Sequence, residues 1–177
     1  MRGRAEARAA QMLARNVEAF SATGYRDERR GALEARLVAD GRLPLALRMN
    51  PEGRIFGGSF ALEIATAEPV LPRTRGLRAR PRGVVRLTGV SFAARRGDEA
   101  GERLAARLAT DERLSRALAD VHFERVRIDP DGRAVIRHMG GSVVWVLFPP
   151  LVRAVPLVRA QAEASADALA AFAAVGS

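Results

Sequence analysis

The first half of the chain alternates between helical and strand-like spacing of its apolar residues. Residues 4–21 have helical spacing, and Gly24 follows where a helix commonly ends. Residues 33–39 and 42–49 flank Asp40-Gly41, a pair typical of a type I′ hairpin turn, which needs positive φ at both central positions. We predict a second turn at residues 50–53. The apolar face of the expected helix consists of Ala9, Met12, Leu13, Val17 and Phe20.

The second half repeats this mixture of patterns. A long apolar stripe with helical spacing begins after Asp98, and Asp111 within it offers a fresh N-cap, so the predicted helix is either continuous or divided there. Gly140-Gly141 predicts a further turn, and Pro156 is placed for the first turn of a last helix. The remaining expected strands cover residues 55–65, 84–94, 122–128, 133–139, 142–148 and 151–155.

This order of elements predicts an α+β fold, in which about three helices pack against a mostly antiparallel sheet. The length suits one domain over residues 1–177. An alternative is two halves, residues 1–68 and 84–177, each a helix followed by a meander of strands. The connection between them, residues 69–83, is basic, and its three prolines favour extended chain.

Charge changes the picture, because the basic residues are concentrated in one place. All 29 basic residues are arginine and the net charge is +9. The bias of a GC-rich genome accounts for many arginines, but it does not explain why carboxylates are missing between Glu68 and Asp98. That stretch contains Arg73, Arg75, Arg78, Arg80, Arg82, Arg86, Arg95 and Arg96.

An arginine cluster of this kind predicts a site for an anion. In an extended chain, Arg78, Arg80 and Arg82 lie on one side at intervals of about 6.6 Å. Guanidinium groups bind phosphate in a bidentate way, whereas aromatic residues that would stack on bases are nearly absent from the stretch. The competing interpretation is a solvated loop whose charge is paired with Glu63, Glu68 or carboxylates on the helix that follows. The candidate anion-binding residues are Arg73, Arg75, Arg78, Arg80, Arg82 and Arg86.

The leading hypothesis is therefore a non-enzymatic binding module that engages a polyanion, either nucleic acid or an acidic protein surface. The alternative is a domain with a cavity between sheet and helices for a small or lipid-like ligand. The candidate lining residues are Val144, Trp145 and Phe172, although an ordinary core role also fits Trp145.

Several kinds of chemistry are excluded or disfavoured. The absence of cysteine and lysine excludes a cysteine nucleophile, a phosphate-binding loop with its lysine, and a Schiff base. His122 and His138 have no third ligand at metal-site spacing, so we expect no metal, no cofactor and no catalytic residue. Without a secretory signal or a transmembrane segment, the expected location is the cytoplasm.

The last third of the chain resembles a family of uncharacterised bacterial proteins, a domain of unknown function. The resemblance covers roughly residues 85–172, and it implies a bacterial source and no established activity. It is carried by Met139-Gly140-Gly141-Ser142, Phe148-Pro149-Pro150, Arg153, Pro156-Leu157 and Gln161.

Overall fold

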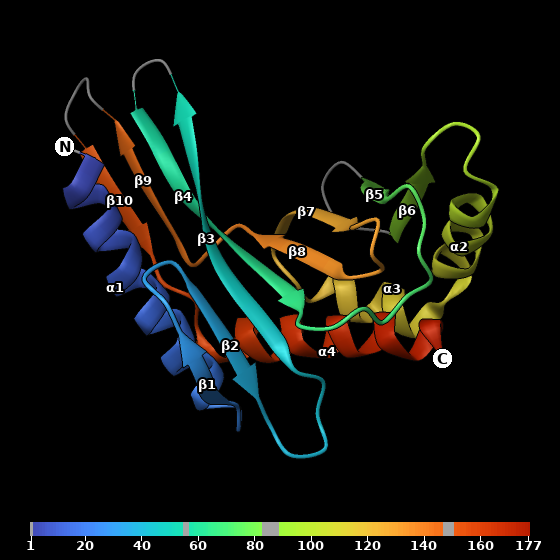
Figure 1. The fold of residues 1–177 in the computed structure, drawn as a ribbon, viewed down its shortest axis with the longest axis horizontal. Helices are drawn as coiled ribbons and strands as arrows, with labels where there is room; N and C mark the ends of the chain where they lie inside the picture. The colour runs from blue at the N-terminus through green and yellow to red at the C-terminus, as the bar shows by residue number, and fades with distance from the viewer. Residues whose placement is uncertain (1, 55–56, 83–88, 147–150) are drawn as a thin grey trace.

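The computed structural model describes residues 2–54, 57–82, 89–146 and 151–177. Within them, four helices pack against one antiparallel sheet of ten strands, which confirms the predicted α+β fold (Figure 1). The elements are α1 (Arg2–Ser21), β1 (Arg26–Arg30), β2 (Glu34–Val38), β3 (Leu45–Arg54), β4 (Gly57–Thr66), β5 (Leu77–Arg82), β6 (Gly89–Ala94), α2 (Glu99–Thr110), α3 (Glu112–Ala119), β7 (Phe123–Ile128), β8 (Ala134–His138), β9 (Ser142–Val146), β10 (Leu151–Val155) and α4 (Arg159–Gly176).

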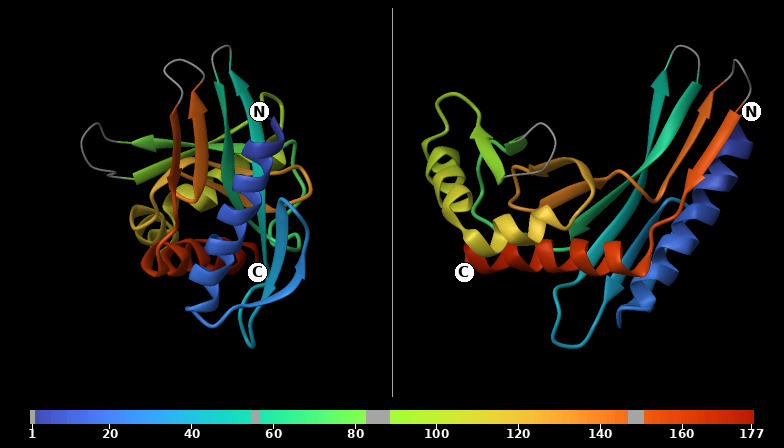
Figure 2. Two further views of the ribbon diagram at one scale, coloured as in Figure 1. Left: turned by 90° about the vertical axis from the view of Figure 1, so that its left-hand side faces the viewer. Right: turned by 180° about the vertical axis from the view of Figure 1, so that it is seen from behind.

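The helices lie against one face of the sheet, whose main path is β1-β2-β3-β4-β8-β7-β5-β6 (Figure 2). Helix α1 packs on β1, β2, β3 and β9, whereas α4 packs on β4 and β8. Helices α2 and α3 contact β6 at the far end. The other face, called the open face below, carries no helix among the described elements.

The sheet forks at β4, because two successive strands share one edge of it. Glu63 of β4 pairs with Arg137 of β8, and Phe60 of β4 pairs with Val143 of β9. Between these two pairs the chain advances three residues along β4 but six residues from β8 to β9. Three extra residues therefore leave the ladder between β8 and β9. Both strands run antiparallel to β4. The predicted turn at Gly140-Gly141 is therefore wrong, because this segment is a bulge in one continuing direction.

Asn16 of α1 seals this bulge. Its side chain is fully buried, and its Nδ2 donates to the Gly141 carbonyl oxygen at 2.9 Å. Its Oδ1 accepts from the backbone N–H of Leu157, just before α4, at 3.2 Å. Gly141 has φ +72°, and a Cβ there would lie 2.4 Å from a methyl carbon of Leu62. One amide side chain therefore ties α1, the sheet and the start of α4 together.

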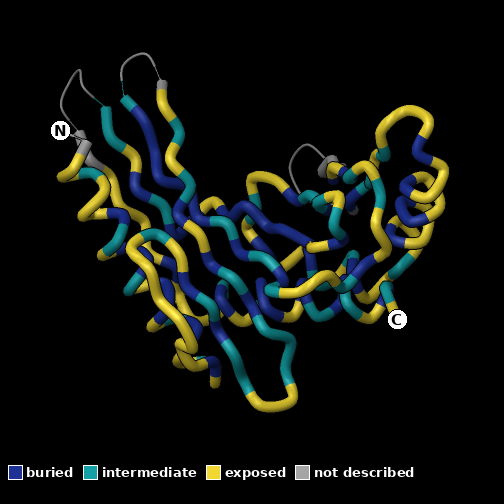
Figure 3. Tube along the Cα trace, in the orientation of Figure 1, coloured by how far each residue is buried: buried dark blue, intermediate teal, exposed yellow. Residues whose placement is uncertain are grey.

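The core lies between the helices and the sheet, as the burial of the chain shows (Figure 3). Phe20 and Tyr25 meet edge to face with ring centroids 5.9 Å apart. At the other end Phe92 of β6 and Phe172 of α4 make the same kind of contact. The helical face predicted for α1 is buried as expected, and the division at Asp111 into α2 and α3 is also confirmed. The face predicted for the C-terminal helix is buried only in part, because Ala162, Leu169 and Phe172 are buried. Val158, which was also predicted to be buried, is exposed just before the helix.

Two predicted turns of the first half differ from the structure. Residues 50–53 lie inside β3, where Pro51 pairs with Phe60. The backbone N–H of Met49 donates to the Leu33 carbonyl oxygen on the β2 side of the strand. Pro51, two residues further along, faces the same side beyond the last paired residue of β2, so its lack of an N–H group costs no hydrogen bond with β2. Asp40-Gly41 does form a loop, but only Gly41 has positive φ, so the turn is not type I′.

Other differences concern individual strands. Strand β1 was not predicted, because its sequence Arg-Asp-Glu-Arg-Arg has no apolar residue and is exposed throughout. The predicted connection 69–83 includes β5, which lies within the sheet between β7 and β6. Strands β1 to β4 form a meander, whereas β8 and β9 both pair with β4 rather than with each other.

Replacing Asn16 tests the importance of the bulge. Asn16→Ala leaves a buried carbonyl and a buried N–H without partners, and each orphaned group costs about 1–3 kcal/mol. We expect the free energy of unfolding, measured by urea titration with circular dichroism, to fall by about 2–4 kcal/mol. Gln11→Ala, at an exposed position of the same helix, is the control and should change stability by less than about 0.5 kcal/mol.

Candidate anion site

The open face carries the arginines that the sheet aligns. A single row of directly paired positions crosses the sheet from β1 to β6, and it is called the cross-strand row below. It contains arginines toward both ends and small apolar residues in the middle, and its last position, on β6, is an alanine. In order, the row consists of Arg29, Arg36, Ala46, Ala65, Val135, Arg127, Arg78 and Ala93.

The β5 end of this row opens into a hollow of about 450 Å³, called the basic hollow below. Arg75, Arg78 and Arg95 line it and are exposed, and Arg127 and Asp129 contribute from the β7 side. Among the described residues, no carboxylate forms an ion pair with the side chains of these three exposed arginines. Three guanidinium groups without an ion pair therefore share one concave surface with Arg127, whose partner Asp129 is the one carboxylate of the described lining, and this excess of positive charge favours an anion there.

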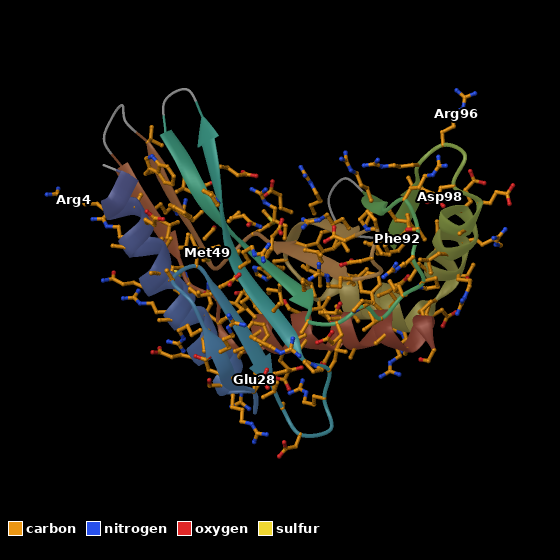
Figure 4. The ribbon with its side chains drawn as sticks, viewed as in Figure 1. Arg4, Glu28, Met49, Phe92, Arg96 and Asp98 are labelled. Atoms are coloured by element: carbon orange, nitrogen blue, oxygen red, sulfur yellow. The ribbon has the colours of Figure 1, made fainter. Side chains whose placement is uncertain are left out.

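Buried Asp98 positions two parts of the basic hollow. Its Oδ2 accepts from the Arg75 backbone N–H at 2.7 Å, and its Oδ1 accepts from the Gly101 N–H at 3.0 Å as the N-cap of α2. Both hydrogen bonds lower the pKa of this carboxyl group, and the bond from the Arg75 N–H has the larger effect. Figure 4 shows Asp98 at the base of the loop from which Arg96 reaches into solvent.

Two of the carboxylates named in the solvated-loop interpretation, Glu63 and Glu68, are engaged elsewhere. Glu63 forms a bidentate pair with Arg127, at 2.6 and 2.9 Å, and Arg127 also contacts Asp129 at 2.8 Å. These hydrogen bonds, that with Glu63 first, raise the Arg127 pKa above its usual value. Glu68 pairs with Arg36 of β2 at 2.8 Å. Glu63 and Glu68 thus neutralise arginines on β7 and β2, outside the basic stretch.

The predicted anion-binding residues are only partly brought together. Arg75 and Arg78 line the basic hollow, and Arg73 is exposed in the preceding loop. Arg80 and Arg82 continue β5, with side chains outside the described part, and Arg86 lies outside the described residues.

The sequence reasoning missed two contributors to the hollow. Arg95 was counted in the basic stretch but not as a site residue, and Arg127 was not considered. A predicted hairpin between residues 77–82 and 89–94 would have revealed Arg95, because it places the end of β6 beside the start of β5.

The structure does not bring the candidate cavity residues together. Trp145 lies half-buried on the helix face of β9, where its ring covers Gly58 and lies 5.5 Å from the Phe60 ring. Val144 points to the open face and is exposed, and Phe172 contacts Phe92 at the other end of the core. None of the three lines the basic hollow.

His138 is a buried titratable group at the bulge. It is 1% exposed, and its Nδ1 accepts from the Gly140 N–H at 2.8 Å, while its Nε2 has no partner among the described residues. Burial, and secondarily nearby His122, lowers its pKa to about 4. His122 is exposed and lies 3.3 Å from Gln161. No three His, Asp or Glu side chains in the described part gather into a metal-binding group.

Together, these features define an α+β protein with one helix-covered sheet face and one open face that is basic at the β5 end. The family model for proteins of unknown function, DUF3156, matches residues 18–175, and the chain belongs to this family. The match is broader than the predicted resemblance. No curated protein matches the chain, and no solved structure does. Among the described helices, none has the length and apolar character needed to cross a membrane.

Replacing two arginines of the cross-strand row, one at a time, tests which of their charges stabilise the fold. Arg127→Ser leaves Glu63, whose side chain is 14% exposed, without its bidentate partner, and we expect a loss of about 2 kcal/mol in the free energy of unfolding. Arg78→Ser removes an unpaired charge beside Arg127, so the change should stay within about 0.5 kcal/mol of zero. Urea unfolding measures both; equal losses for the two variants would contradict the assignment.

The neutral state of His138 predicts a pH-dependent stability. Its folded pKa of about 4 lies below the usual 6.5, so the folded state binds fewer protons and stability is lost as pH falls below about 6.5. From pH 7 to pH 5 this histidine should cost about 2 kcal/mol. His138→Asn retains a hydrogen-bond acceptor but has no titratable ring. The variant should therefore lack the part of the stability loss that comes from protonation of His138. His122→Gln is the control and should retain most of it, because burial is the main cause of the lowered His138 pKa.

Proposed function

We propose that this protein is a non-enzymatic binding module that engages an anionic partner through the basic hollow. The partner is a polyanion, nucleic acid or an acidic protein surface, met in the cytoplasm of a bacterium as the composition and the family resemblance suggest. The observation that carries the proposal is that Arg75, Arg78 and Arg95 line one hollow without a carboxylate partner in the described part.

Physical chemistry supports an anion at this place. Arg78 lies directly opposite Arg127, whose charge is engaged by Glu63 and Asp129, whereas no described carboxylate forms an ion pair with Arg78. A bound phosphate or carboxylate supplies a counter-charge for Arg78, and the planar guanidinium group donates two parallel hydrogen bonds to it. Asp98 holds the Arg75 backbone in place, so one arginine of the hollow is positioned before a ligand arrives.

The cavity alternative receives no comparable support. Its three candidate residues lie in different surroundings, and the ring of Trp145 packs against Phe60 and Gly58. We therefore propose one function only.

The test is a salt titration with matched charge variants. Wild-type protein should bind a labelled single-stranded oligonucleotide, followed by fluorescence anisotropy, with affinity that falls about twentyfold between about 50 and 200 mM salt if three arginines contact phosphates. The triple variant Arg75→Ser, Arg78→Ser and Arg95→Ser should lose most of this dependence. A labelled polyglutamate peptide tests the acidic-protein arm in the same way.

The control removes the same charge from another surface. Arg4, Arg8 and Arg15 are exposed along α1, and Figure 4 shows Arg4 projecting from the end of that helix far from Arg96. Their triple replacement by serine should leave binding within about twofold of wild type. If this control lost as much affinity as the hollow variant, attraction would come from net charge alone. If neither probe bound the wild type at low salt, the function would be rejected.

A further inference from the structure

We infer that the anionic partner is a single-stranded nucleic acid that crosses the open face along the cross-strand row, held by its backbone at both ends. This inference rests on the proposed function and extends it from one hollow to the whole sheet. Its starting point is a second hollow of about 290 Å³, which shares Arg127 and Asp129 with the basic hollow. The two hollows are therefore neighbours on one surface.

The far end of the row also offers guanidinium groups. Arg29 of β1 lines the second hollow and is exposed, and no described carboxylate forms an ion pair with it. Arg48 lines the same hollow, and its contact with Glu34 is 3.4 Å between side chains that are both more than 60% exposed. An exposed pair of this kind contributes about 0–1 kcal/mol, so a phosphate replaces the carboxylate at little cost.

The middle of the row is low and electrically balanced. Ala46 and Ala65 are short and only partly buried, whereas Val135 is covered, because Glu63 of β4 and Arg127 of β7 form an ion pair across β8. A polymer backbone that follows the row therefore passes over short side chains and then over a neutral ion pair. The neighbouring Arg137 has its charge engaged by Glu52 and Glu124. Affinity should therefore come from the two ends, with the middle serving as a passage.

The length of the row decides between classes of anion. From Arg29 on β1 to Arg78 on β5 the sheet takes six inter-strand steps, which at about 4.8 Å each span about 29 Å. A single phosphate or a compact polyphosphate cannot contact both ends. A polymer with regularly repeated charges can, and a nucleic acid backbone has this regularity whereas an acidic protein surface in general does not.

The twist of the sheet favours a flexible single strand over a duplex. Neighbouring strands rotate by roughly 20–25° each, which accumulates over the six steps, and a duplex with a persistence length of about 150 base pairs is too stiff to follow. No aromatic residue lines either hollow, so the bases have no stacking platform. Recognition should therefore be independent of base sequence.

The experiment compares strand length with charge position. Labelled oligothymidylates of about 3 and 12 nucleotides, and a 12-base-pair duplex, are titrated by fluorescence anisotropy at about 100 mM salt. The variant Arg29→Ser with Arg48→Ser should bind the short strand as wild type does but lose roughly tenfold in affinity for the long strand. The control, Arg26→Ser with Arg30→Ser, removes equal charge from β1 at positions that do not line the second hollow, and it should match wild type on both.

The outcomes separate this inference from the proposed function. If the variant Arg29→Ser with Arg48→Ser kept wild-type affinity for the long strand, the extended path would be overturned while the basic hollow remained the site. If the duplex bound as tightly as the long single strand, the assignment to single strands would be overturned. If the Arg75, Arg78 and Arg95 variant bound both strands normally, the proposed function itself would fail.

Discussion

The fold depends on one constraint, which is that β4 has only one edge available for two successive strands. The opposite edge is occupied by β3 over its whole length, so β8 and β9 must follow one another along β4, and the chain must leave the ladder between them. The backbone N–H and C=O groups that lose their ladder partners at this break are buried, so they need other hydrogen-bond partners. Gly141 donates to Val155 and accepts from Asn16, and Gly140 donates to His138. The positions of α1, β10 and α4 all follow from these few bonds.

The same sheet divides the arginines into two groups. In its centre, Glu52, Glu63 and Glu124 bring carboxylates to Arg127 and Arg137, and these charges stabilise the sheet in pairs. At the β5 end the chain supplies no acid between Glu68 and Asp98, so the arginines there remain available. The proposed anion binding is thus a result of where carboxylates are absent, more than of how many arginines exist.

The sequence predicted the α+β class, most strands and the helical faces, because these depend on local periodicity. It did not predict β1, whose five charged residues carry no apolar pattern, nor the continuation of β3 through Pro51. It also named Arg78 among the candidates but could not place Arg95 or Arg127 beside it. Those neighbours depend on the pairing of β5 with β6 and β7, which joins residues distant in sequence. The role of Asn16 was likewise invisible, since its partners are 125 and 141 residues away.

Pro51 has a consequence for how copies of this protein meet. Beyond Arg48, β3 runs on past the end of β2, so among the described strands that side has no neighbour. An unpaired strand edge invites the edge of another molecule, and repetition of that contact leads to aggregation. Pro51 interrupts the row of donors at this edge, so an incoming strand finds no continuous ladder. One proline thus lets the long hairpin of β3 and β4 extend into solvent while discouraging fibre growth.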